Sequence, residues 1–304
     1  MDKLNKLNLD IGSLNLNNPV LPASGCFGPE LAKFTTVSSI GAIVPKTIFL
    51  YPRKGNPSPR TAEAPYGMLN SVGIPSDGLE DFLQNKIEHY ANMGPPLIIS
   101  IGGLNIPNYW DLAERLNEVN SVKALEINVS CPNIDEGGLE IGSNPSNLAI
   151  LVEGVVKRFS KPVITKLTPN VTSITEIAVA AETAGSTAVS LINTVSAIGV
   201  NMVEKSITTG LGKAGLSGPA IKPIALKMVW DVSQNVKIPI VGMGGITNTE
   251  DALEFILAGA SAISVGTATF TRPNTMIDII QGLESYATEN NLKNIQDIRG
   301  QIGQ

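Results

Sequence analysis

Eight short apolar runs, each followed by a segment of helical pattern, are the feature that most constrains the fold of this chain. The runs cover residues 20–23, 42–47, 97–101, 122–129, 163–167, 188–194, 238–242 and 262–266. Continuously apolar strands that alternate with helices are typical of a parallel sheet that is buried on both faces. Eight such units predict an α/β fold of the closed (β/α)8, or TIM barrel, type.

Boundary signals for the helices agree with this pattern. Residues 173–176, with the sequence Ser-Ile-Thr-Glu, form a capping-box pattern ahead of a run that stops at Gly185. Residues 247–250 give the same signal ahead of a run that stops at Gly259. No linker or low-complexity stretch divides the chain, so we expect residues 1–304 to form a single domain.

Two connections are longer than a barrel requires. They run over residues 50–77 and 195–216, and the second is rich in Gly, Thr and Ser. Long loops at the carboxyl face of a barrel usually bind or cover substrate, which is the role we expect for both, although a purely structural role is an alternative.

Composition narrows the range of partners and compartments. The chain has 22 basic and 27 acidic residues, a net charge of -5, and no run of like charges, so we expect no nucleic-acid partner. Residues 1–18 lack the apolar core of a signal peptide, and no later segment is long enough to span a bilayer. A cytosolic enzyme that acts on a small molecule is therefore expected.

The counts of cysteine and histidine exclude several kinds of site. Two cysteines, Cys26 and Cys131, are too few for an iron–sulfur cluster and form no disulfide framework. The one histidine, His89, lies in a polar helical segment and is expected on the surface. A metal site is therefore not expected, and a general base must be a Cys, Lys, Asp, Glu or Tyr residue.

Cys131 is the strongest candidate for that base. It follows the apolar run at 122–129 and precedes Pro132, which places it in a loop at the carboxyl end of a strand. A thiol there, without a histidine partner, suits a lone base or nucleophile with an unperturbed pKa of about 8.5. A buried structural thiol is the alternative. Cys26, which follows the first run, is interpreted as a packing residue.

Polar residues at the ends of the other runs should meet at the same mouth. They are Lys46, Thr47, Ser100, Asn128, Lys166, Asn193 and Thr194. A single lysine at a strand end could simply extend its amine to solvent, but two lysines with two asparagines favour a site for an anion or a heterocycle. Asparagine amides can pair with a ring that carries alternating N–H and C=O groups.

Glycines after the last two runs predict a phosphate site. They occur in residues 242–246, Gly-Met-Gly-Gly-Ile, and in Gly266-Thr267. Backbone N–H groups at this position of a (β/α)8 barrel commonly hold a phosphate. No G-x-G-x-x-G sequence follows an early strand, so FMN fits better than a dinucleotide.

These motifs together resemble class 1 dihydroorotate dehydrogenase. The resemblance is carried, in the right order, by residues 45–47, 70–74, 128–133, 191–194, 215–220 and 242–246. It implies an FMN-containing barrel that oxidises dihydroorotate to orotate in pyrimidine synthesis. Cys131 falls on the family's catalytic base, which removes the C5 proton while the C6 hydride passes to the flavin.

The resemblance also implies two sets of binding residues. Those expected to contact orotate are Lys46, Asn70, Ser71, Val72, Gly73, Ile74, Asn128, Asn193 and Thr194. Those expected to contact FMN are Ser24, Lys46, Thr47, Ser100, Asn128, Lys166, Ile192, Gly218, Gly244, Gly245, Gly266 and Thr267. Lys166 would stabilise negative charge on the reduced ring. Ser100 stands where the family usually has an asparagine, so a retuned flavin contact is expected there.

The sequence after Cys131 resembles the NAD-linked form, class 1B. Residues 131–138 read Cys-Pro-Asn-Ile-Asp-Glu-Gly-Gly, without the Gly-Lys-Pro-Gln stretch of the fumarate-linked class 1A. The NAD-linked form implies a homodimer of catalytic subunits within a heterotetramer, whose partner subunits carry FAD and a 2Fe–2S cluster. The alternatives are the class 1A enzyme, a flavoprotein related to dihydropyrimidine dehydrogenase, and a flavin-free barrel that binds a phosphorylated ligand.

Overall fold

Seven parallel strands form the central sheet of the computed structural model, which describes residues 5–130 and 141–302. They are β3 (Val20–Pro22), β6 (Leu97–Ile101), β7 (Val122–Asn128), β8 (Val163–Lys166), β9 (Ala188–Leu191), β14 (Ile240–Met243) and β15 (Ala262–Val265). Their order is β3-β15-β14-β9-β8-β7-β6, so each strand lies beside its neighbour in the chain except where the first strand pairs with the last. That pairing curls the sheet toward closure.

The predicted strand at 42–47 closes the ring, but it is not a regular strand. Ile43 and Ile48 each make an isolated parallel bridge to β6, and Gly41 N donates to Val20 O at 2.8 Å on the opposite side. Pro45 in the middle of the segment has no N–H to donate, which prevents a continuous ladder of hydrogen bonds. The eight-unit barrel is therefore confirmed, and the expectation of a regular second strand is wrong.

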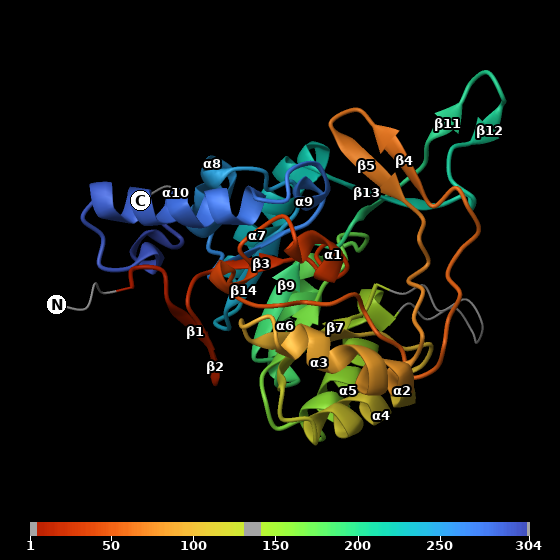
Figure 1. The fold of residues 1–304 in the computed structure, drawn as a ribbon, viewed down its shortest axis with the longest axis horizontal. Helices are drawn as coiled ribbons and strands as arrows, with labels where there is room; N and C mark the ends of the chain where they lie inside the picture. The colour runs from red at the N-terminus through yellow and green to blue at the C-terminus, as the bar shows by residue number, and fades with distance from the viewer. Residues whose placement is uncertain (1–4, 131–140, 303–304) are drawn as a thin grey trace.

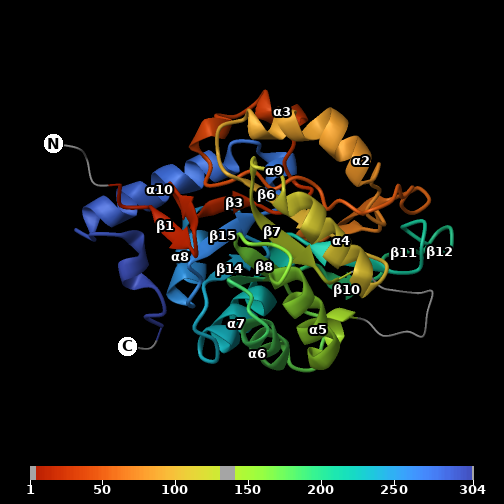
Figure 2. The ribbon, with the colours of Figure 1, turned by 90° about the horizontal axis from the view of Figure 1, so that it is seen from below.

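Helices surround these strands (Figure 2). The longer ones are α4 (Ile106–Asn117), α5 (Pro145–Val156), α6 (Ile174–Thr183), α7 (Lys222–Ser233), α8 (Thr249–Leu257) and α10 (Thr275–Glu289). A bent unit of α2 (Leu79–Asp81), η2 (Phe82–Lys86) and α3 (Ile87–Ala91) precedes β6. Single turns are α1 (Pro29–Ala32), η1 (Val37–Ser39), η3 (Ile141–Ser143), η4 (Pro219–Ile221), α9 (Ala268–Thr271) and η5 (Ile295–Ile298).

One of the two predicted helix starts is correct and the other is displaced by a residue. Ser173 caps α6 by accepting a hydrogen bond from Glu176 N at 3.3 Å. For α8 the cap is Asn248, which accepts from Asp251 N at 2.9 Å. Thr247 is not the cap because its hydroxyl instead donates to the Asp251 carboxylate at 2.7 Å.

The inside of the barrel is apolar at its amino end. Its buried cluster is made of Leu21, Ala42, Val44, Ile98, Ala124, Ile164, Ala188, Val241, Met243 and Ala262, joined by Leu9, Ile11, Leu14 and Leu16. The last four residues belong to the hairpin of β1 (Leu9–Ile11) and β2 (Leu14–Leu16), in which they alternate with exposed residues. This hairpin forms a floor under the barrel, so polar chemistry is confined to the carboxyl end.

The two long connections pair with each other in an antiparallel sheet of order β10-β13-β5-β4. The first supplies β4 (Thr61–Ala64) and β5 (Gly67–Asn70), and the second supplies β10 (Val195–Ala197) and β13 (Ala214–Ser217). A hairpin of β11 (Val200–Asn201) and β12 (Ser206–Ile207) extends the second connection. Figure 1 shows β4, β5, β11 and β12 projecting to one side of the barrel. The predicted loops are thus partly strands.

Among the described residues, no helix has both the length and the apolar character needed to cross a membrane.

The floor hairpin generates a prediction for stability. Ile11 is fully buried, so Ile11→Ala removes apolar contacts and leaves a cavity that should lower the free energy of unfolding by about 2 to 5 kcal/mol. The exposed Asn15 on the same hairpin provides a control, since Asn15→Ala should change it by less than about 0.5 kcal/mol. Urea unfolding followed by circular dichroism measures both. Equal effects of the two substitutions would contradict the assignment of the hairpin as a packed floor.

Candidate functional site

A chain of hydrogen bonds joins polar side chains from four strand ends. The hydroxyls of Thr47 and Ser100 lie 2.9 Å apart, and Asn128 Nδ2 donates to Thr47 Oγ1 at 3.2 Å. Asn193 Nδ2 donates to Asn128 Oδ1 at 3.3 Å, and that oxygen also accepts from Ser130 N. Thr47, Ser100 and Asn128 are buried and Asn193 is half-buried. The strand ends therefore meet as the sequence predicted.

Lys166 lies at the end of β8, the strand beside β7, and is 5% exposed. Its Nζ donates to Ser24 Oγ at 3.2 Å, a bond that spans the barrel between the first and fifth units. Its Nζ also lies 3.7 Å from Oε1 of Glu126 on β7, whose Oε2 accepts from Ser190 Oγ at 3.2 Å. Ser24 and Lys166 are thus brought together as expected, with a buried carboxylate below them.

Sequence reasoning missed Glu126. The residue interrupts the apolar run Ala124, Leu125, Ile127, which by itself indicates only a buried strand. A charged side chain within such a run needs a partner inside the protein, and this was the available signal.

Glycines form a narrow turn at the end of β14. Gly244 has φ +126°, and a Cβ there would lie 2.7 Å from the Ala225 Cβ. Gly245 has φ +79°, and a Cβ there would lie 3.0 Å from Gly218 O. The positive φ angles and the close neighbouring atoms therefore require glycine at both positions. Ile192, also in the expected set, is buried beside this turn and donates its N–H to Met243 O.

The turn after β15 joins the same region. Gly266 and Thr267 precede α9 (Ala268–Thr271), and Thr269 N donates to Gly266 O at 3.0 Å. Thr267 Oγ1 donates to Ser217 Oγ at 2.8 Å, which ties this turn to β13 and thereby to Gly218. The glycines at 218, 244 and 245 and the turn at 266–267 thus lie on adjoining segments, as expected for a phosphate site.

Residues 70–74 form a braced strip beside the mouth. Ser71 N donates to Arg60 O at 2.7 Å, and Arg53 Nε donates to Gly73 O at 2.8 Å. Asn56 N donates to Val72 O at 3.0 Å. Ile74 has φ +44°, which is strained for a β-branched residue.

This strip reaches the rest of the site through Gly215. Asn70 Nδ2 donates to Gly215 O at 3.2 Å, and a Cβ at Gly215 would lie 2.1 Å from Thr194 Oγ1. Thr194 N in turn donates to Asn193 Oδ1 at 2.7 Å. The expected orotate contacts Asn70, Asn193 and Thr194 are therefore connected through β13.

Lys46 differs from Lys166 because its side chain is exposed at the mouth. Its stem passes Gly25, where a Cβ would lie 3.4 Å from Lys46 Cγ. Partial desolvation lowers the pKa of its amine, and the positive charge of Arg60 lowers it further. Among the described residues, Lys46 makes no ion pair, and its side chain is exposed at the mouth.

The two cysteines have different positions. Cys131 lies outside the described residues, so its predicted role as base stays a prediction. Cys26 is half-buried, and burial raises the pKa of its thiol to about 11 against the positive charges of Lys166 and Lys46. Such a thiol is almost entirely protonated at neutral pH, which agrees with its interpretation as a packing residue.

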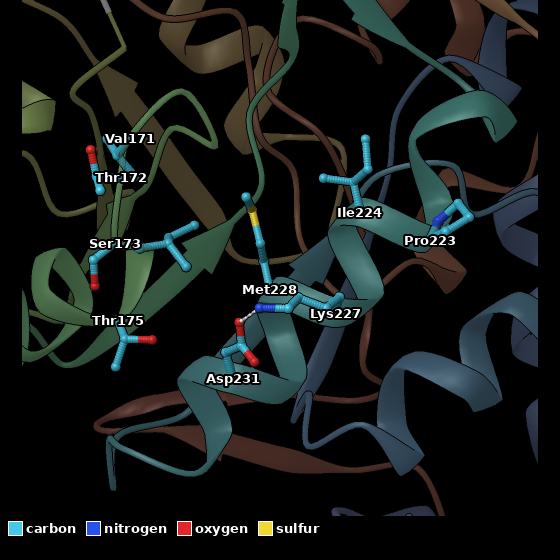
Figure 3. Close-up of a pocket in the computed structure, with 10 residues that line it drawn as sticks. Val171, Thr172, Ser173, Thr175, Pro223, Ile224, Lys227, Met228 and Asp231 are labelled. Carbon is cyan, nitrogen blue, oxygen red and sulfur yellow. Dashed lines mark hydrogen bonds and ion pairs between the residues drawn. The ribbon is translucent and has the colours of Figure 1, made fainter.

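Other parts of the described chain offer no competing site of the kinds considered. His89 is exposed on α3, as expected. The described residues contain no group of three or more His, Cys, Asp or Glu side chains that could hold a metal ion. Figure 3 shows a surface groove between the start of α6 and α7, and none of the predicted site residues line it.

Comparison with known proteins decides the family. The model of the family described as dihydroorotate dehydrogenase matches residues 6–286. The chain belongs to the dihydroorotate dehydrogenase family. Membership confirms the resemblance drawn from the motifs and makes the chain an oxidoreductase.

Three bacterial relatives carry the same name, "Dihydroorotate dehydrogenase B (NAD(+)), catalytic subunit". The protein of Desulforamulus reducens is 44% identical over 299 residues, and that of Pelobacter propionicus is 42% identical over 298 residues. The protein of Geotalea uraniireducens is 41% identical over 298 residues. Each alignment covers 97% of this chain and 98% of the relative.

The raised pKa of Cys26 generates a prediction for this dihydroorotate dehydrogenase family member. In a Cys131→Ser variant, Cys26 should react with a thiol reagent at pH 8 about two orders of magnitude more slowly than in the urea-unfolded chain. Because the thiolate is the reactive form, the rate should rise about tenfold per pH unit until the pH nears 11. Stopped-flow absorbance measures the rate, and a profile that levels off near pH 8 to 9 would contradict the burial of the thiol.

Proposed function

We propose that this chain oxidises dihydroorotate to orotate in pyrimidine biosynthesis and is the catalytic subunit of an NAD-linked dihydroorotate dehydrogenase. The observation that carries the proposal is the buried amine of Lys166 beside paired asparagine amides at the mouth of the barrel. This is the arrangement that an electron-accepting ring and a flat pyrimidine require. Near full-length similarity to proteins of that name supports it.

The described residues fit FMN. The turns at Gly244-Gly245 and Gly266-Thr267 suit a phosphate, because they follow β14 and β15, the last two strands, where backbone N–H groups of a (β/α)8 barrel commonly hold one. Lys166 lies buried within the barrel, and the remaining contacts that we expect are Ser24, Lys46, Thr47, Ser100, Asn128, Ile192 and Gly218. When bound, FMN supplies an acceptor for a hydride.

The orotate end of the proposed site lies between the barrel mouth and the strip at 70–74. Lys46 offers an exposed cation for the substrate carboxylate. Asn128 and Asn193 offer amides for the ring, and Asn70 and Thr194 approach from the antiparallel sheet. The strained backbone of Ile74 supports a functional role for the strip, since strain of this kind gathers at ligand sites.

Cys131 acts as the base in this proposal, on the strength of the sequence resemblance. Its thiolate takes the C5 proton of dihydroorotate, and the C6 hydrogen leaves with its electron pair as a hydride. The C5–C6 bond becomes a double bond, so the products are orotate, one proton on sulfur and one hydride transferred. No histidine is needed for this step.

Electron transfer to NAD requires a second subunit in this proposal. A chain with two cysteines lacks the ligands for a 2Fe–2S cluster. We therefore propose a cytosolic heterotetramer, in which a homodimer of this chain binds two subunits that carry FAD and the cluster. The fumarate-linked enzyme is the alternative, and direct reduction of fumarate by this chain would favour it.

The role of Cys131 is testable with the purified chain. Under anaerobic conditions, dihydroorotate should bleach the flavin absorbance, and Cys131→Ala should slow the bleaching by about 10² to 10⁴-fold while FMN stays bound. Stopped-flow absorbance measures the rate. Cys26→Ser is the matched control and should bleach at the normal rate.

Two results would contradict the assignment. Bleaching by dihydrouracil but not by dihydroorotate would point to a different pyrimidine substrate. A chain that purifies without any flavin, and does not take up FMN, would favour a phosphate-binding barrel without redox function.

The proposed partner gives a separate prediction. The chain alone should reduce almost no NAD with dihydroorotate, because its hydride acceptor lacks a path to the nucleotide. Addition of an iron–sulfur flavoprotein subunit should restore NADH formation, measured by absorbance. Rapid NAD reduction by the chain alone would refute the need for a partner.

A further inference from the structure

Glu126 and Lys166 form an ion pair inside the barrel, and the proposed reaction gives the carboxylate no role. Glu126 is 6% exposed and Lys166 is 5% exposed. Lys166 Nζ lies 3.7 Å from Glu126 Oε1, which has no hydrogen-bond partner among the described residues. Glu126 Oε2 is held by the hydroxyl of Ser190 at 3.2 Å. The carboxylate is thus fixed on one side and open toward the amine on the other.

The pair occupies the boundary between the apolar interior and the polar mouth. Glu126 lies opposite Ile164 in the register of β7 and β8, and Lys166 lies opposite Asn128 one step nearer the mouth. The carboxylate is therefore anchored one step deeper than the lysine. On its other side the amine donates to Ser24 Oγ at 3.2 Å. The charge of Lys166 is held between a carboxylate below and a hydroxyl across the barrel.

A buried amine needs a partner of opposite charge, because desolvation makes an unpaired ion inside a protein costly. The hydroxyl of Ser24 carries no net charge and cannot offset that cost alone. The negative charge of Glu126 offsets the cost of burying the amine. The distance of 3.7 Å between Lys166 Nζ and Glu126 Oε1 is longer than a direct hydrogen bond. An N–H of Lys166 accordingly stays available for a ligand at the mouth.

We propose that Glu126 is a positioning residue, which holds the amine of Lys166 in place so that the amine stabilises the negative charge of reduced FMN. This inference rests on the proposed function, since it requires FMN beside Lys166. Reduction of the flavin by two electrons and one proton adds one negative charge to the ring. Glu126 acts on that equilibrium through Lys166, although its own charge has the opposite effect on the ring.

The effect of Glu126 through Lys166 and its direct effect on the ring shift the midpoint potential of bound FMN in opposite directions. Measuring this potential in Glu126→Gln therefore decides between them. The glutamine amide has nearly the same shape and still accepts from Ser190. If the amine of Lys166 is no longer held at the ring, the equilibrium constant for two-electron reduction should fall about tenfold, a shift of about -30 mV. Spectroelectrochemical titration measures it without substrate. A higher or unchanged potential would overturn the proposal, because removal of a direct field from Glu126 raises the potential.

A variant that lacks the Lys166 amine tests whether Glu126 acts on the potential through Lys166. In Lys166→Met, Glu126→Gln should no longer lower the potential, since no amine remains to be held in place. A fall of equal size in that background would also overturn the proposal. Glu182 provides the matched control, because its carboxylate binds the backbone ahead of β14 at the amino end of the barrel. Glu182→Gln should leave the potential unchanged, and an equal fall there would mark the effect as unspecific.

If Glu126→Gln yields no flavin-containing protein, a variant with a smaller change at the same position can be measured instead. Glu126→Asp retains the charge but withdraws the carboxylate by one methylene, so the potential should fall by less than tenfold in the equilibrium constant. A rise or no change would overturn the proposal. The outcome is separable from the proposed function: wild-type protein that binds FMN but is not bleached by dihydroorotate refutes the reaction and leaves the potential measurements valid.

Discussion

Closure of the parallel strands into a ring is the constraint on which the rest of the structure depends. Pairing of β15 with β3 joins the last unit to the first, and the bridges from Ile43 and Ile48 to β6 fill the remaining gap. Since the seven strands and the bridged segment at 42–47 then run in the same direction, residues far apart in the chain lie at one rim. The bond from Lys166 to Ser24 joins residues 142 positions apart and depends on this closure.

The inward-facing side chains of the barrel change from apolar to polar within one or two inward positions along each strand. On β7 the inward positions run from Ala124 through Glu126 to Asn128, and on β8 from Ile164 to Lys166. Below this boundary the side chains need only pack, while above it each polar group needs a partner. Most find one another across strands, which makes the mouth a connected network.

Much of this arrangement could be predicted from the sequence, because buried parallel strands have a strong local signature. The second unit departs from a regular strand since Pro45 interrupts its hydrogen bonding. The antiparallel sheet was not predicted, because β5 and β13 have four residues each and pair across more than a hundred positions. The ion pair of Glu126 could not be predicted for a similar reason, because its partner Lys166 lies on the neighbouring strand β8.

The pairing of β5 with β13 joins two segments that are distant in the chain into one antiparallel sheet. Asn70, at the end of β5, faces the pyrimidine end of the proposed site, while β13 leads directly into Gly218 at the phosphate end. A ligand that orders one strand would also order the other, which would link occupancy at the two ends energetically. By reciprocity, whatever factor the pyrimidine adds to retention of the nucleotide, the nucleotide must add to retention of the pyrimidine.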